Sequence, residues 1–183
     1  MAEPMFRDLR ADEIECRVAQ AKQNGVSLLL YKDARCDQNI LDETVGPMNW
    51  QREHCRENAN CVVSIWDKEK NLWIRKEDTG KESNTEAEKG LASDSFKRAC
   101  FNWGIGRELY TAPFIWISAE NCVALQQNGQ RWQCFDQFFV EKIVIKNKRI
   151  KAVSIKNERT KKRCFVWTDE DYQDYQAGST KRR

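Results

Sequence analysis

Residues 93–110 read SDSFKRACFNWGIGRELY, and this stretch decides how the remainder of the chain is interpreted. In a helix, Phe96 and Cys100 lie four residues apart on one face, while Lys97 and Arg98 lie on another. Paired cations on a rigid helix suit phosphate groups, because Arg offers a fork of donors and Lys a point charge. From the spacing alone, an ordinary solvated pair of cations is the simpler interpretation.

The helix around this stretch has recognisable ends. Thr85 and Glu88 fit a capping box at its start, and the sequence GIG at residues 104–106 stops it. Upstream, short apolar segments separated by polar turns predict an antiparallel meander of three strands, at residues 50–55, 61–66 and 72–76. The predicted order of elements is therefore strand, strand, strand, helix.

The N-terminal part is expected to combine helices with one strand. Apolar side chains recur at helical spacing over residues 7–24, and Asn24-Gly25 is typical of a helix C-cap. The apolar run at residues 26–31 is too short for an independent helix and predicts a strand. Residues 37–45 predict a short helix, which ends where Gly46-Pro47 breaks the chain.

The C-terminal part reads as a second, smaller unit. Alternating apolar and polar residues predict a β-meander with strands at residues 138–145, 149–155 and 163–167. Residues 118–131 predict a loop or a short helix. We therefore expect an α+β protein with a core at residues 1–117, a C-terminal β extension at 118–169 and a disordered tail at 170–183.

Composition limits the class of protein. The chain has 183 residues, of which 40% are hydrophobic, so it can bury a sizeable core. No apolar run approaches the roughly 20 residues that span a bilayer, and the charged N-terminus lacks the apolar region of a secretory signal. We expect a cytoplasmic protein with no membrane partner.

The cysteines and the phosphate-binding motifs give no indication of a cofactor. None of the eight cysteines forms a C-x-x-C pair, and the single histidine is His54. Zinc ligands are usually spaced more closely, so we expect free thiols that act as small hydrophobic groups and no metal site. No G-x-x-x-x-G-K-[ST] loop is present, so the expected activity does not use ATP.

Positive charge is concentrated near the C-terminus, although the net charge is only +3. Residues 140–167 contain ten Lys or Arg residues and two acids. One interpretation is an auxiliary DNA site on the basic strand faces, formed by Lys146, Lys148, Arg149 and Lys151. The other is a charged sheet edge that protects against aggregation.

The motifs, taken together, resemble those of one protein family. KEDTG at residues 76–80 and EAEKG at 86–90 precede the stretch at 93–110. Further upstream, YKDAR at 31–35, NILD at 39–42 and VGPMNW at 45–50 follow in the same order as in that family. The chain resembles the Rad52-like single-strand annealing proteins over about residues 14–117, and it is closest to the bacterial and phage branch, where WGIGRELY is typical.

The resemblance implies a β-β-β-α annealing core that assembles into rings or arcs, with single-stranded DNA in an outer basic groove. Lys97 and Arg98 match the family cations that contact the DNA backbone, and Tyr31 matches a tyrosine near the same groove. The chain also departs from the family pattern. A third family cation falls at Phe101, and the family arginine before the first strand has only Arg17 and Lys22 as imperfect matches.

The expected function is therefore ATP-independent binding of single-stranded DNA and annealing of complementary strands in recombination or repair, without catalysis. The apolar residues 114–117 (FIWI) are consistent with a homo-oligomer, because such a run must be covered. A binding module that protects DNA ends or serves replication without annealing is the alternative, and docking of a single-stranded DNA-binding protein is left open. A magnesium-dependent nuclease would have to use the acids Glu77, Asp78, Glu82, Glu86 and Glu88, which suit a turn and a helix start equally well.

Overall fold

The computed structural model describes residues 5–81 and 87–172. The chain forms two compact units, Met1–Asp8 with Asp33–Arg107 and Leu9–Lys32 with Glu108–Arg183. The two units therefore alternate along the chain, and the larger part of the first, Asp33–Arg107, is inserted into the sequence of the second. Thr85 of the predicted capping box, and the predicted tail from residue 173 onward, lie outside the described residues.

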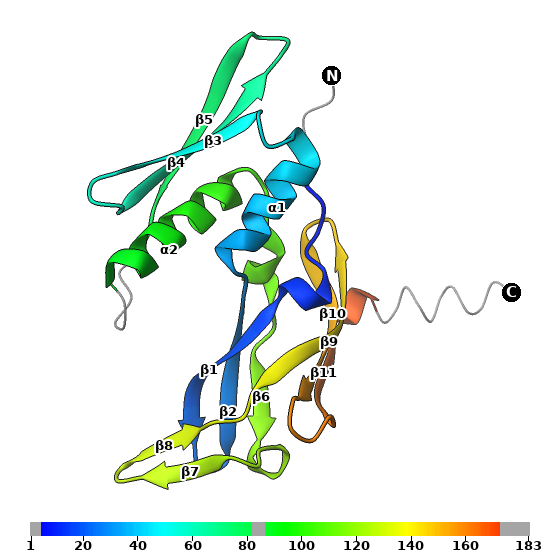
Figure 1. Ribbon diagram of the computed structural model, residues 1–183. Coiled ribbons are helices and arrows are strands. Elements are labelled where there is room, and N and C mark those ends of the chain that lie inside the picture. Colours follow the sequence, from blue (N-terminus) through cyan, green and yellow to red (C-terminus); the bar gives the residue numbers. More distant parts are fainter. Residues whose placement is uncertain (1–4, 82–86, 173–183) are drawn as a thin grey trace, which may run out of the picture. The chain divides into compact units, whose positions relative to one another are not determined.

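The first unit contains a three-stranded antiparallel sheet and two α-helices (Figure 1). Its elements are α1 (Ala34–Val45), β3 (Trp50–Cys55), β4 (Asn60–Asp67), β5 (Leu72–Thr79) and α2 (Ala87–Asn102). The strands pair in the order β3-β4-β5. The three strands and the helix predicted after them are present, as is the helix predicted at residues 37–45.

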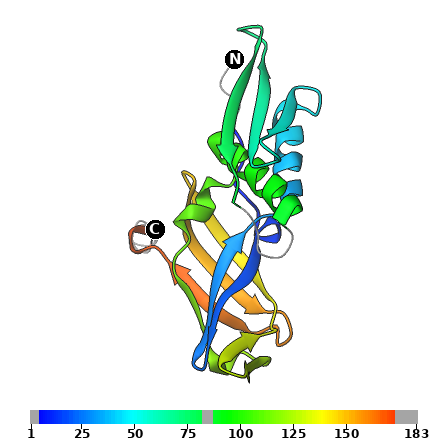
Figure 2. The same cartoon turned by 90° about the vertical axis from the view of Figure 1, so that its left-hand side faces the viewer.

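Helix α2 packs against strands β4 and β5, and Figure 2 shows α1 and α2 on the same side of the sheet. The ring of Phe96 is fully buried and stacks on Trp50, with their centroids 6.1 Å apart. The indole N–H of Trp103 donates to the carbonyl oxygen of Val63 at 3.0 Å. Burying a phenylalanine ring stabilises a fold by about 1.5–3 kcal/mol, so Phe96 is a major anchor of α2.

The end of α2 agrees with the prediction from its glycines. The Ile105 N–H donates to the Cys100 carbonyl at 3.1 Å, and the Gly104 N–H donates to the Phe101 carbonyl at 2.9 Å. Gly104 has φ +92°, a conformation that L side chains rarely adopt. This is the hydrogen-bond pattern of a Schellman motif, which satisfies the last carbonyls of the helix.

The second unit contains a six-stranded sheet, a separate two-stranded hairpin and short 3-10 turns. The sheet has the order β11-β10-β9-β1-β2-β6, and every neighbouring pair is antiparallel. Its strands are β1 (Glu15–Lys22), β2 (Gly25–Tyr31), β6 (Ile115–Ser118), β9 (Phe138–Lys146), β10 (Arg149–Asn157) and β11 (Arg163–Thr168). The remaining elements are η1 (Ala11–Glu13), η2 (Arg107–Thr111), η3 (Ala119–Asn121), β7 (Leu125–Asn128) and β8 (Arg131–Cys134).

The six-stranded sheet curves until its edge strands β6 and β11 approach each other (Figure 1). The side chains of Val26, Ile117 and Ile155 are fully buried in its core. Residue 117, the expected end of the core, lies within β6, and strands from both sides of this position share the sheet. The C-terminal strands are therefore joined to β1 through the pairing of Glu15 with Phe139.

The helix predicted at residues 7–24 is wrong, because residues 15–22 form β1. Cys16 and Val18 alternate with exposed neighbours, as in a half-buried strand. Asn24 does not cap a helix but lies in the tight turn between β1 and β2, where Lys22 pairs with Gly25. The spacing of the apolar residues in this segment is compatible with a helix and with a strand. The segment forms a strand because it pairs with β2.

Residues 118–131, predicted as a loop or a short helix, contain the 3-10 turn η3 and then strand β7. Strand β7 pairs with β8 as an antiparallel hairpin. In residues 5–81 and 87–172, neither α-helix has the length and apolar content needed to cross a bilayer.

Candidate nucleic-acid interface

The residues predicted to contact DNA fall into separate groups. Lys97 and Arg98 lie on α2 of the first unit. Tyr31, Arg17 and Lys22 lie on the β1–β2 hairpin of the second unit, and Lys146, Lys148, Arg149 and Lys151 lie around the β9–β10 turn of the same unit.

Lys97 is a half-exposed cation in the middle of α2. No carboxylate within the described residues lies at ion-pair distance from its ammonium group. Its charge contributes to lowering the pKa of Asp33, although the hydrogen bond from Arg35 is the main cause. Lys97 is therefore available to a phosphate group without first losing a carboxylate partner.

Arg98 is held by its neighbours more firmly than Lys97. Its Nε lies 3.6 Å from Oδ1 of Asp78 on β5, and this buried Nε has no hydrogen-bond partner in the part of the chain that is described. Asp78 in turn accepts hydrogen bonds from the Thr79 N–H at 2.7 Å and from Nδ2 of Asn102 at 3.3 Å. The acid therefore positions the Arg98 guanidinium and also competes for its charge.

Two further cations surround the C-terminal end of α2. Nζ of Lys76 donates to the Asn102 carbonyl at 2.8 Å and lies 4.4 Å from the centre of the Trp103 ring. Arg107 donates from Nε to the Phe101 carbonyl at 2.6 Å and from Nη2 to the Asn102 carbonyl at 3.0 Å. Both compensate the negative end of the helix dipole. Neither residue was predicted to take part in the site, although Lys76 belongs to the KEDTG motif and Arg107 to the WGIGRELY motif.

Gly80 allows the end of β5 to lie directly against α2. A Cβ atom at this position would lie 2.6 Å from the backbone nitrogen of Ser95 and 2.9 Å from the Leu91 carbonyl oxygen. Any side chain would therefore push the helix away from the strand. The glycine of the KEDTG motif has a packing role that sets the position of the helix.

Tyr31 and Arg17 lie together on the exposed face of the β1–β2 hairpin. Tyr31 pairs with Glu15, and Arg17 pairs with Leu29, which is 53% exposed. The Tyr31 hydroxyl donates to the Glu15 carboxylate, and this hydrogen bond, followed by burial, raises the pKa of Tyr31 to about 12. This face therefore brings together an aromatic ring, an apolar side chain, a cation and the Glu15 carboxylate.

Lys22 lies at the other end of the same strand. It is exposed beside the hairpin turn, where it pairs with Gly25. At about 3.3 Å per residue, it is roughly 16 Å from Arg17 along β1. Of the two imperfect matches to the family arginine, only Arg17 lies close to Tyr31.

Lys146, Lys148 and Arg149 gather at the β9–β10 turn, where Lys148 has a positive φ. The ammonium of Lys146 lies 4.9 Å from the centre of the Tyr172 ring. Lys151, farther along β10, forms an ion pair of 2.8 Å with Asp169, and its hydrogen bond is the main cause of the lowered pKa of Asp169. In the predicted basic group, the charge of Lys151 is therefore compensated by an acid.

Much of the positive charge of residues 140–167 is paired in the same way. Oε1 of Glu141 lies 2.9 Å from Nζ of Lys156, and its Oε2 lies 2.6 Å from Nε of Arg163. Lys161 pairs with Glu158. The hydrogen bond from Arg163 is the largest cause of the strongly lowered pKa of Glu141.

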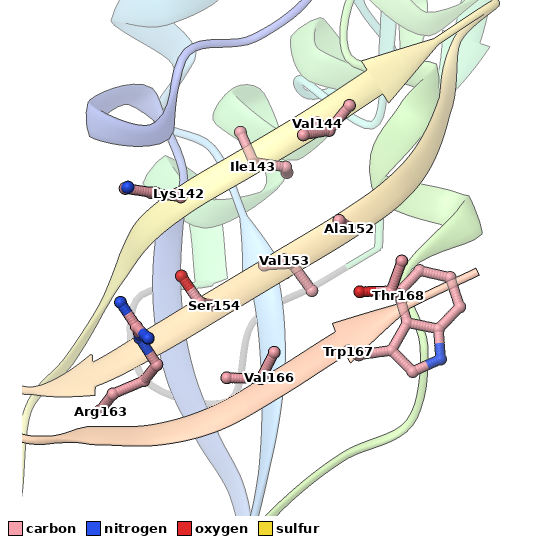
Figure 3. Close-up of a pocket in the computed structure, with 10 residues that line it drawn as sticks. All are labelled: Lys142, Ile143, Val144, Ala152, Val153, Ser154, Arg163, Val166, Trp167 and Thr168. Atoms are coloured by element: carbon pink, nitrogen blue, oxygen red, sulfur yellow. The ribbon is translucent and has the colours of Figure 1, made fainter. Parts of the chain in front are cut away.

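A shallow hollow of about 300 Å³ lies on strands β9, β10 and β11 (Figure 3). Lys142, Ser154 and Arg163 supply its polar lining, and the remaining lining residues are mostly apolar, including Val166 and Trp167. Val166 is 64% exposed. The hollow is open and weakly charged, so its geometry does not single out a ligand.

The acids considered for a nuclease site are engaged in local hydrogen bonds where they are described. Oε1 of Glu77 accepts from Nδ2 of Asn60, and Asp78 binds the groups already named. Residues 82–86 lie outside the described residues, as does the side chain of Glu88. The two described acids, Glu77 and Asp78, therefore stabilise the end of β5 and its contact with α2 through hydrogen bonds.

Comparison with known proteins adds one relative. No protein-family profile matches the chain, and no solved structure matches it. Over 98 residues, the chain is 35% identical to the single-stranded DNA-binding protein DdrA of Deinococcus radiodurans. The match covers 52% of this chain and 47% of DdrA, so the chain spans about half the length of the curated relative to which it is similar.

Proposed function

We propose that this protein binds single-stranded DNA and promotes annealing of complementary strands, without ATP and without catalysis. The observation that carries the proposal is the 35% identity to a protein named for binding single-stranded DNA. The similarity of the motifs to the Rad52-like family supports the annealing role. The cations on α2 are the groups proposed to bind the DNA backbone.

The chemistry of annealing suits the residues found on α2. Two complementary strands repel each other through their phosphates, and cations that bind the backbone reduce this repulsion while the bases stay free to pair. We propose that Lys97 contacts a phosphate and that Arg98 contacts another with the part of its guanidinium not held by Asp78. Tyr31 and Arg17 are proposed as a second contact, and Lys22 as a more distant phosphate contact.

The binding proposal is tested by fluorescence anisotropy with a labelled oligonucleotide at several salt concentrations, with and without Mg²⁺. We expect affinity that falls steeply with salt and an oligonucleotide that stays intact when Mg²⁺ is present. Magnesium-dependent cleavage would favour a nuclease instead, and an affinity that does not depend on salt would contradict the backbone contacts.

Binding without annealing is a second candidate function. The arrangement at α2 favours it, because the third cation of the family pattern is replaced by Phe101 and Arg98 is partly engaged by Asp78. Such a protein would protect DNA ends or assist replication. Mixing complementary oligonucleotides with the protein distinguishes the candidates, because an annealing protein accelerates duplex formation and a protective one slows it.

Self-association into a ring or arc is proposed together with the annealing role. Ile115 and Ile117 are buried in the core of their own unit, but Phe114 is 77% exposed and stacks on Trp116. Tyr110 is 68% exposed. A second copy of the chain could cover these rings. Sedimentation is expected to give species well above 21.5 kDa, and a monomer with and without DNA would exclude the assembly.

We also propose that two parts of the chain have different functions. Residues 1–117 would supply DNA binding and oligomerisation, and residues 118–169 would add an auxiliary DNA site around the β9–β10 turn. That site would hold a second strand or duplex. We place the protein in the cytoplasm of a bacterial or phage-infected cell, where a single-stranded DNA-binding protein is a candidate partner.

A further inference from the structure

One cluster of side chains in the second unit lies outside the residues proposed to contact DNA. Cys122 follows η3, Cys134 ends β8, and Asp136 lies between β8 and β9. Their two Sγ atoms and one carboxylate oxygen all lie within 4.8 Å of one another. Cys122 and Cys134 are twelve positions apart in the sequence, so a search for closely spaced ligand pairs does not find them.

Asp136 is the unusual member of the cluster. It is only 5% exposed, and its Oδ2 accepts hydrogen bonds from the Val123 N–H at 2.9 Å and the Ala124 N–H at 2.8 Å. The Cys134 thiol lies 3.4 Å from the same oxygen. The other oxygen, Oδ1, is buried and accepts no hydrogen bond of good geometry from the described residues, because the nearby Asn157 amide donates to the Asn121 carbonyl instead. A buried carboxylate oxygen without a partner costs free energy, and a cation would remove that cost.

The surroundings are rich in sulfur. Cys164 on β11 is near enough to Cys122 and Asp136 to interact with them electrostatically. Its Sγ is directed at the Ile155 carbonyl oxygen at 3.5 Å. Three thiols therefore lie near the Asp136 carboxylate.

We propose that Cys122, Cys134 and Asp136 form a binding site for a single zinc ion. Thiolates and carboxylates are both zinc ligands, with bonds of about 2.3 Å and 2.0–2.2 Å, so neighbouring ligand atoms lie roughly 3.5–3.8 Å apart. The observed separations between the three ligand atoms are all below 4.8 Å. Small side-chain rotations would therefore bring all three atoms to bonding distance from one zinc ion. Two sulfur ligands favour zinc over magnesium or calcium, which prefer sites made only of oxygen.

The ion would have a structural role. Its ligands come from the segment before β7, from the end of β8 and from the connection to β9, so it would fasten the β7–β8 hairpin to the rest of the unit. The backbone N–H groups of Val123 and Ala124 already orient the carboxylate, as the outer partners of metal ligands commonly do. Structural zinc sites stabilise the folds that contain them.

The test uses the full chain, freed of metal by a chelator and kept reduced so that no disulfide forms. Titration with Co²⁺ is expected to give one equivalent bound per chain, with a near-ultraviolet thiolate-to-cobalt band that Zn²⁺ abolishes. Zn²⁺ is also expected to raise the melting temperature. Cys134→Ser should lower the Co²⁺ affinity by at least roughly 10- to 100-fold, since even outer partners of metal ligands have effects of this size.

Two further variants make the result decisive. Asp136→Asn retains an oxygen that can accept from Val123 and Ala124, so it should fold while losing the same affinity as Cys134→Ser. Cys55→Ser, which changes an exposed cysteine of the first unit, should bind Co²⁺ like the parent. The proposal is overturned if the reduced parent gives no thiolate-to-cobalt band, or if folded Asp136→Asn binds Co²⁺ as tightly as the parent.

Discussion

Helix α2 of the first unit and strands β9–β11 of the second both contain cations expected to meet DNA, but the acids that compensate these cations are placed differently in the two regions. The strands have many more cations, ten in residues 140–167. At least four of them, Lys151, Lys156, Lys161 and Arg163, are in ion pairs with described residues. On α2, Arg98 lies 3.6 Å from Asp78 of β5, while Lys97 has no carboxylate partner in the described part of the chain. The number of cations in a segment therefore overstates its attraction for a polyanion.

The reason for the difference is the pairing of strands. Antiparallel neighbours bring residues distant in sequence side by side, so Glu141 on β9 meets Lys156 on β10 and Arg163 on β11. A helix surface offers mainly neighbours three and four positions away. For Lys97 those positions hold Ser93, Asp94, Cys100 and Phe101, and the one acid among them, Asp94, accepts instead from the Lys81 N–H at 2.8 Å.

The largest effect on DNA binding is expected from Lys97→Ala combined with Arg98→Ala. Loss of two phosphate contacts should weaken binding and reduce the magnitude of the log–log salt slope by about 1.4, at roughly 0.7 per contact for single strands. Anisotropy titrations across a range of salt concentrations measure this. Lys70→Ala is the matched control, because it removes an exposed cation of the same unit that Asp67 already compensates and that has no proposed contact with DNA. Equal slopes for parent and double variant, with unchanged circular dichroism, would exclude the helix from the interface.

Gly80→Ala should disturb the helix without changing its charge. The added Cβ would meet the Ser95 backbone at 2.6 Å, and strain of this kind typically costs about 1–3 kcal/mol. Denaturant unfolding should show this loss of stability, and single-stranded DNA affinity should fall because the cations of α2 move with the helix. A variant with parental stability and affinity would show that β5 and α2 separate easily.

Charge reversal at the β9–β10 turn should have a smaller effect than the helix variants. In Lys146→Glu, Lys148→Glu and Lys151→Glu combined, we expect slower annealing and weaker duplex binding, with single-stranded DNA affinity near that of the parent. Electrophoretic mobility shifts with both kinds of DNA measure the difference. Parental annealing and duplex binding would exclude an auxiliary site there and leave protection of the sheet edge as the role of these cations.

The smallest effect on DNA binding is expected from Glu141→Gln, which releases Lys156 and Arg163 from their shared acid. Affinity should rise slightly at low salt. The pKa of Glu141 is lowered in the folded state, so its ionised form adds stability above the ordinary value of 4.5, and this stability is lost as pH falls further. The melting-temperature deficit of the variant should thus be constant near neutral pH and shrink below about pH 4.5. A deficit independent of pH would show that the ion pairs do not stabilise the fold.

The parts of the fold predicted from sequence are those set by local signals. Alternating residues and polar turns indicated β3, β4 and β5, and the glycines after Trp103 indicated the end of α2. The error at β1 arose because Ile14, Val18 and Ala21 fit a helix, while Cys16 between the first two supports the alternation of a strand. Only β2 and β9, the partners of β1, resolve this ambiguity.

For the candidate site, the sequence predicted individual residues but not the contacts between them. The motifs identified Lys97, Arg98 and Tyr31 as candidate DNA contacts. The ion pair between Asp78 and Arg98, however, depends on the separation of β5 and α2. The pairing of Glu141 with two cations depends on β-bulges that shift the register of β10 against both its neighbours. The cluster of Cys122, Cys134 and Asp136 depends on the path of the chain around β7 and β8. None of these distances follows from spacing in the sequence.

The insertion of the first unit between Lys32 and Glu108 has a consequence for the order of folding during synthesis. Helix α1, strands β3–β5 and helix α2 are contiguous, so they can fold as soon as residue 107 has left the ribosome. Strand β1 can pair at once with β2, but the sheet on its other side stays open until β9, which begins at residue 138, has been made. Pairings this distant raise the contact order and slow folding. The β1–β2 hairpin, with Leu29 and Tyr31 exposed, is therefore the segment of the nascent chain most in need of protection from aggregation.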